Sequence, residues 1–175
     1  MDPRLQEMLD HYEIRKTLAL CAHGCDRGDA DLMGSTYTGE DSIDDHGHAR
    51  VPGPEFAHLA TELIRERTEA VWHLLGQTLV RIEDDTAVVE TAFLALMRKL
   101  PDQAGRSHVN QLAGRYVDQL ERLDGKWKIK NRTCIRDTSI TLAVEKDEYA
   151  GVGFRAGTRD GNDLGVASLG MAHRA

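Results

Sequence analysis

The stretch Glu13–Asp31, EIRKTLALCAHGCDRGDAD, has the pattern of an amphipathic helix that ends on an acidic residue. Four of its side chains recur at helical spacing and can share one buried stripe: Ile14, Leu18, Cys21 and Cys25. Asp26 follows at the edge of that stripe, and Gly28 favours helix termination just beyond it. Because an acidic side chain on an apolar face is costly unless it is paired, we expect a partner for Asp26. The candidate is His73, in the strand-like run AVWHLLGQTLVRIE.

The periodicity predicts three helices in the first 70 residues. The first spans residues 4–25. A short second helix runs from about Ala30 to Thr36, with Asp29 as its N-cap. The pattern then predicts a short strand at Ser42–His48. Pro52 and Pro54 then open a third helix that runs to about residue 68, since proline is tolerated in a first helical turn.

After the third helix the hydrophobic period changes to that of strands. Four long β-like runs follow: Val71–Glu83, Ala87–Leu100, Val109–Leu123 and Trp127–Ser139. Two tight turns, at residues 83–86 and at Asp124-Gly125, join neighbouring runs, and Pro101–Ser107 forms a longer polar loop. This order predicts an α+β fold: a cone-shaped, strongly bent antiparallel sheet whose three N-terminal helices enclose a pocket on its concave side.

The last 31 residues differ from the rest of the chain. Residues 1–144 carry the predicted domain, whereas residues 145–175 are rich in glycine and poor in large apolar side chains. Such a segment cannot form a core of its own. We expect this tail to be disordered, or to lie across a neighbouring subunit or the pocket mouth.

The composition limits the partners of the chain. It has 175 residues, a net charge of −7 and three cysteines. Nucleic acids and anionic membranes require a basic face, so we expect neither as a partner. No apolar run is long enough to span a bilayer, and the N-terminus is too charged for a signal peptide. An odd number of cysteines without metal-finger spacing suits a reducing compartment, so the predicted location is the cytoplasm.

The order of elements, with Asp26 in CDRGD, His73 in VWHLLGQ and the hairpin ERLDGKWKI, resembles the SnoaL-like group of the nuclear-transport-factor-2-like superfamily. The resemblance covers residues 5–140. The group includes lindane dehydrochlorinase, scytalone dehydratase and bile-acid dehydratase, and relatives that release formaldehyde from lignin-derived diaryl propanes. The resemblance implies that an Asp–His pair transfers protons in an elimination, with neither a metal nor an organic cofactor.

An aspartate beside a histidine fixes the imidazole tautomer and stabilises the imidazolium, so that the histidine can act as a general base. Strand alternation places His73 on one face with Val71, Leu75 and Gln77. If that face is concave, His73 lies among aliphatic walls beside an amide donor. The alternative is a core histidine that is paired with a carboxylate only for stability.

Further polar residues are candidates for the same pocket. His46 is a candidate second acid, because a hydroxyl group leaves poorly unless it is protonated. Asp44, His46 and His48 could also form a metal site, although a polar rim strand is the simpler interpretation. Dehydratases of the group often carry a tyrosine one turn before the aspartate. In this chain that position is near Cys21, so the role of the tyrosine is vacant or falls to Tyr37 or Tyr116. The candidate substrate-binding residues are Tyr37, Cys21, Tyr116, Arg132 and Asn110.

These observations favour a cofactor-independent lyase that acts on a small, largely apolar substrate, which we expect to be aromatic. It would eliminate water, halide or formaldehyde, with Asp26, His73 and His46 as catalytic residues. An isomerase or polyketide-type cyclase could use the same pair of residues. A non-catalytic ligand-binding or dimerisation module is also compatible with the fold. The convex face of a bent sheet leaves apolar surface to cover, which predicts a homo-oligomer, a dimer or trimer.

Overall fold

The computed structural model describes residues 2–144, 149, 151–160 and 162–171. Its helices are α1 (Pro3–Arg27), α2 (Ala30–Gly34), α3 (Gly53–Arg67) and α4 (Leu164–Ser168). Its strands are β1 (Ile43–Asp45), β2 (Arg50–Val51), β3 (Thr68–Glu83), β4 (Thr86–Lys99), β5 (Ser107–Leu123) and β6 (Lys126–Val144). The predicted α+β order of three helices followed by four long strands is confirmed.

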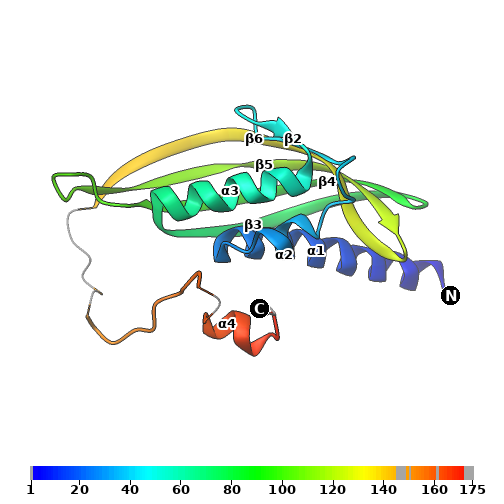
Figure 1. Cartoon of the computed structure of the whole chain (residues 1–175). Helices are drawn as coiled ribbons and strands as arrows, with labels where there is room; N and C mark the ends of the chain where they lie inside the picture. The colour runs from blue at the N-terminus through cyan, green and yellow to red at the C-terminus, as the bar shows by residue number, and fades with distance from the viewer. Residues whose placement is uncertain (1, 145–148, 150, 161, 172–175) are drawn as a thin grey trace.

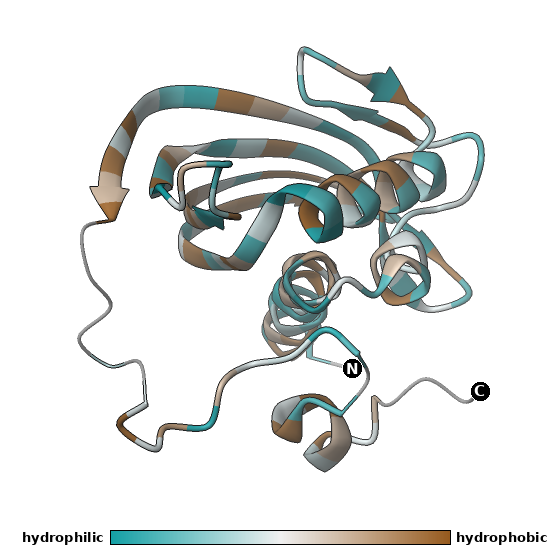
Figure 2. Ribbon diagram, turned by 60° about the vertical axis from the view of Figure 1, so that its left-hand side comes forward, coloured by the Kyte–Doolittle hydropathy of each residue, from teal (hydrophilic) through white to brown (hydrophobic). Residues whose placement is uncertain are grey.

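The strands form one curved sheet in the order β2-β1-β6-β5-β4-β3. Figures 1 and 2 show the long strands bending around α1, α2 and α3, which fill the concave side. The four long strands are antiparallel, as predicted, but β1 pairs with β6 in parallel, so the sheet as a whole is mixed. A parallel pairing is possible here because β1 and β6 are far apart in sequence and no short hairpin joins them.

The main core lies where α1 crosses the strands near their hairpin ends. Ile14 of α1 is fully buried with Val89, Leu120, Trp127 and Ile129 of the sheet. Burying each such side chain contributes about 1.5–3 kcal/mol. This core fixes α1 against the sheet and so determines where the last turn of the helix, which carries Asp26, meets β3.

The turn between α1 and α2 depends on a glycine. A Cβ atom added at Gly24 would lie 2.7 Å from the backbone nitrogen of Met33, closer than real Cβ contacts come. The two helices therefore approach each other over Gly24, and Met33 is buried beneath the end of α1. Asp29 caps α2 by accepting a hydrogen bond from the Leu32 backbone, as the sequence predicts.

A β-bulge divides β3 into two halves. Leu75 pairs with Phe93 but Thr78 pairs with Thr91, so β3 has one more residue than β4 across this step. The extra residue reverses the inward face, and Gln77 is exposed. The prediction that Gln77 shares the pocket face with His73 is therefore wrong, because unbroken alternation does not continue past Leu75.

The described part of the tail lies against its own chain. Figures 1 and 2 place α4 on the side of α1 away from β5 and β6. Asp163 accepts a hydrogen bond of 3.2 Å from Arg27 at the end of α1. Arg159 donates to the backbone oxygens of Ile64 and Glu69, at 3.1 and 2.6 Å, where α3 joins β3. The predictions for residues 145–148, 150, 161 and 172–175 lie outside the described residues.

None of the helices among the described residues combines the length and apolarity needed to cross a membrane.

Candidate active site

Asp26 and His73 form a buried pair between α1 and β3. Nδ1 of His73 lies 2.6 Å from Oδ1 of Asp26, and the backbone N–H of His73 donates to Oδ2 at 2.9 Å. The Asp26 side chain is 7% exposed and that of His73 is 13% exposed. Because an ionised carboxylate only accepts hydrogen bonds, Nδ1 must carry the proton. The other ring nitrogen, Nε2, is then free to accept a proton.

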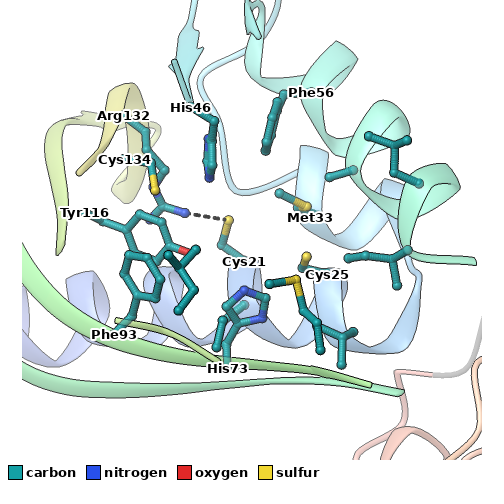
Figure 3. A pocket seen from close by; sticks show the side chains of 18 of the residues that line it. Cys21, Cys25, Met33, His46, Phe56, His73, Phe93, Tyr116, Arg132 and Cys134 are labelled. Carbon is teal, nitrogen blue, oxygen red and sulfur yellow. Dashed lines mark hydrogen bonds between the residues drawn. The ribbon is translucent and has the colours of Figure 1, made fainter. Parts of the chain in front are cut away.

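His73 borders a cavity of about 350 Å³ between the helices and the concave face of the sheet. Most of the wall is aliphatic or aromatic, and includes Leu18, Met33, Leu63, Val71, Phe93 and Leu112. Figure 3 shows His73 reaching into this space from the sheet side, with Cys21 above it. A cavity of this size and apolarity fits a small organic molecule. The pairing of Asp26 with His73 beside a cavity agrees with the sequence-based prediction.

A second carboxylate–imidazole pair borders the same cavity. Nδ1 of His46 lies 2.5 Å from Oδ1 of Asp44, and the Tyr37 hydroxyl donates to Oδ2 of Asp44, also at 2.5 Å. The Asp44 side chain is fully buried, and that of His46 is 19% exposed. The His46 ring stacks on Phe56 with ring centroids 4.3 Å apart. In Figure 3 this ring enters the cavity from the side opposite His73.

Arg132 places a buried positive charge at the same end of the cavity as His46. Its guanidinium donates to both carboxylate oxygens of Asp118, at 2.8 and 2.9 Å, and the Asp118 side chain is fully buried. Its Nη1 lies 3.3 Å from Sγ of Cys21, the contact drawn as a dashed line in Figure 3. The guanidinium also lies over the Tyr116 ring, 4.2 Å from its centroid. Asp118 thus compensates the charge and fixes its position.

Two of the cavity thiols are poor nucleophiles. Burial raises the pKa of Cys134 to about 11, and burial followed by the negative charge of Asp26 raises the pKa of Cys25 further. Burial also raises the pKa of the Tyr116 phenol well above its usual value, so this side chain remains neutral. Since thiolates are the reactive form of cysteine, neither Cys25 nor Cys134 is activated as a nucleophile.

The structure brings most of the predicted site residues together. Asp26 is bonded to His73, which lines the cavity. The other predicted residues that line the cavity are His46, Cys21, Tyr116 and Arg132. Tyr37 is buried behind Asp44 and does not border the cavity, so its predicted contact with substrate is not available here. Asn110 also lies off the wall, where its side chain accepts a hydrogen bond from Thr141 at 3.0 Å.

Sequence reasoning missed Asp118 and the pairing of Asp44 with Tyr37. Asp118 alternates with Tyr116 and Leu120 along β5, so it faces inward with apolar neighbours. An acid at an inward position requires a cation, which was a usable signal for Arg132. The Tyr37–Asp44 contact had no such signal, because it joins a loop to a short strand.

The metal-site alternative at Asp44, His46 and His48 finds no support in the geometry. Nδ1 of His46 is bonded to Asp44, and Nδ1 of His48 lies 3.1 Å from the backbone oxygen of His46. Within the described ranges, no group of three or more His, Cys, Asp or Glu side chains is arranged to hold a metal ion.

Residues 6–133 match the SnoaL-like domain family. Curated proteins yield no match. A protein from Novosphingobium aromaticivorans, provisionally named a scytalone dehydratase, has a similar structure (TM-score 0.67, 17% identity, 81% of this chain and 97% of that chain). Hexachlorocyclohexane dehydrochlorinase LinA-type3 from Novosphingobium barchaimii also has a similar structure (TM-score 0.69, 19% identity, 87% of this chain and 99% of that chain). At these identities the structural likeness establishes the fold.

Proposed function

This chain belongs to the SnoaL-like domain family, and we propose that it is a lyase that removes a proton and a leaving group from a small, largely apolar substrate. The observation that carries the proposal is the Asp26–His73 pair, whose 2.6 Å contact lies at the wall of an apolar cavity. The similarity to structures named for a dehydratase and a dehydrochlorinase supports the same reaction class.

His73 is the general base in this proposal. Asp26 holds the ring through Nδ1 and the strand through the backbone N–H, so both the tautomer and the ring orientation are fixed. Nε2 then takes a proton from a substrate carbon, and Asp26 stabilises the imidazolium that forms. A positioned general base contributes about 10²–10⁴-fold to the rate.

The cavity walls favour an apolar, aromatic-sized substrate. Phe93 and Tyr116 stack with ring centroids 4.2 Å apart and line the sheet side of the cavity. Leu18, Met33 and Leu63 close the helix side. Excluding water from such a site strengthens the electrostatic interactions within it. Water and halide are leaving groups that this step allows. Loss of formaldehyde requires a different step, in which His73 takes a hydroxyl proton, the O–H electron pair forms the C=O bond of formaldehyde, and the C–C bond breaks with its electron pair left on the remaining substrate carbon.

The test compares the wild-type protein with His73→Gln on a panel of aromatic alcohols, diols and halides, with product masses recorded. We expect His73→Gln to remove turnover and to keep the fold, as judged by circular dichroism and thermal unfolding. His58→Gln, at an exposed position on α3, is the matched control and should retain full activity.

Near-normal turnover by His73→Gln would overturn the proposed mechanism. A product with the mass of the substrate would reassign the site to an isomerase or cyclase, which returns the proton instead of losing a group. Tight binding of panel compounds without any turnover would favour a ligand-binding module.

A further inference from the structure

The cavity contains two carboxylate-supported imidazoles, and the proposed function uses only one of them as a base. His46 is bonded to Asp44 at 2.5 Å much as His73 is bonded to Asp26 at 2.6 Å. Both histidines border the cavity and approach it from opposite sides (Figure 3). Because Nδ1 of His46 is bonded to the carboxylate, Nε2 is the nitrogen available to a bound molecule.

The surroundings of His46 hold its ring in one position. Phe56 stacks on one face of the ring, and Tyr37 donates to the second oxygen of Asp44. Burial, followed by the influence of the nearby Cys21, raises the pKa of the Tyr37 phenol well above its usual value, so the hydroxyl remains a donor. A Cβ atom added at Gly53 would lie 2.1 Å from Cδ1 of Tyr37, so this ring packs directly on the backbone of α3.

The two ends of the cavity differ in polarity. The Tyr116 ring lies 6.1 Å from the His46 ring, and the buried Arg132 guanidinium lies over the Tyr116 ring. The His46 end therefore brings together hydrogen-bonding and charged groups, with the carboxylates of Asp44 and Asp118 paired to His46 and Arg132. His73 lies instead beside aliphatic wall residues such as Val71 and Leu75.

We propose that His46 is the general acid of the reaction, that Asp44 and Tyr37 position it, and that the leaving group is a hydroxyl released as water. This inference rests on the proposed function and narrows its substrate to an alcohol whose hydroxyl-bearing carbon is next to an acidic C–H. His73 takes the carbon-bound proton, and the C–H electron pair becomes the new C=C π bond. The C–O bond breaks, its electron pair stays on oxygen, and that oxygen takes the Nε2 proton of the His46 imidazolium.

The test uses two substrates that differ in the leaving group alone: the aldol adduct of benzaldehyde with acetone, and the chloride that replaces its hydroxyl. Both give the same conjugated ketone, which is followed by its ultraviolet absorbance after subtraction of the uncatalysed rate. We expect His46→Gln to slow loss of water on the order of 10²-fold and loss of chloride by no more than about threefold, since chloride leaves without a proton. His73→Gln should abolish both reactions, and His58→Gln neither.

The positioning residues are tested by a spectroscopic signature. In ¹⁵N spectra of the neutral histidines, His46 of the wild-type protein should carry its proton on Nδ1. Asp44→Asn should shift His46 toward the Nε2–H tautomer and slow only the loss of water. Tyr37→Phe should act in the same direction but less, and His73 should keep its own tautomer in both variants.

Each outcome separates the inference from the proposed function. Equal slowing of both substrates by His46→Gln, or an Nε2–H tautomer of His46 in the wild-type protein, would overturn the acid role while His73 remains the base. Full activity of His73→Gln on both substrates would overturn the proposed function itself. Consumption of neither substrate by the wild-type protein would overturn the assignment of this substrate class.

Discussion

Helix α1 contains two buried aspartates with different partners. Asp10, near the start of the helix, accepts hydrogen bonds from Arg122 at 2.5 and 3.0 Å and from the Trp127 indole at 3.0 Å. Asp26, near its end, is bonded to His73 beside the cavity. A guanidinium is always charged and releases no proton, whereas an imidazole exchanges one near neutral pH. Under the proposed function, the same kind of side chain on one helix serves stability at one end and proton transfer at the other.

The largest expected effect is on activity at the Asp26 end. Asp26→Asn should lower kcat about 10²–10⁴-fold, because an amide neither fixes the His73 tautomer nor stabilises its cation. The free energy of unfolding should change by about 1 kcal/mol or less, since the amide oxygen can still accept the His73 backbone N–H. Steady-state kinetics and urea unfolding measure the two effects. Loss of stability with unchanged kcat would show that Asp26 is structural.

At the Asp10 end we expect a large loss of stability and little change in turnover. Asp10→Asn leaves the Arg122 guanidinium without its buried partner and should lower the free energy of unfolding by about 3 kcal/mol. Asp85 remains bonded to Arg122 and limits the loss. Turnover measured below the new unfolding temperature should stay within about twofold of the wild type. A selective fall in kcat would contradict the division between the two ends.

The pH dependence of stability should also report Asp10. Hydrogen bonds from Arg122 lower the pKa of this carboxyl below its ordinary value of 3.8. A lowered pKa in the folded state contributes stability that is present above the unfolded-state value and is lost as the pH falls through the folded-state value. The free energy of unfolding of the wild-type protein, measured with urea, should therefore decrease as the pH drops below about 4. Asp10→Asn should show a flatter profile in that range, and an unchanged profile would contradict the assignment.

The smallest effect concerns the outer face of the strand that carries His73. Trp72 and Leu74 are each 48% exposed there, and Leu79 is 67% exposed. We expect a dimer or trimer that covers such surface. Light scattering at micromolar concentration should give a mass above 19.5 kDa, and Leu79→Glu should shift it toward the monomer with kcat retained. A monomeric wild-type protein would contradict the expectation.

The sequence predicts the architecture and the Asp26–His73 pair well, because both rest on periodicity and on a family resemblance. Helical spacing places Asp26 beside the buried stripe of α1, and alternation places His73 on the inner face of β3. The exposure of Gln77 was missed, because one inserted residue reverses the alternation that predicted it. Gly76, within a strand pattern, was the available sign of a bulge.

Other parts of the site depend on pairings between distant segments. Asp118 and Arg132 are 14 residues apart on neighbouring strands, and their bidentate contact follows from the β5–β6 register. That register includes irregular steps which alternation along a single strand does not reveal. The contacts of Arg159 with the α3–β3 junction were also beyond reach, because the tail has no periodic pattern.

The bulge in β3 separates the half of the strand that faces the cavity from the half that packs in the main core. Val80 and Ile82, beyond it, pack against the main core, while His73 precedes it and faces the cavity. Loss of the extra residue would force one half of the strand to turn over relative to the other. If the core half kept its packing, the imidazole would point to the outside of a protein that still folds. One deletion there would therefore remove the proposed base from the cavity while the main core stays in place.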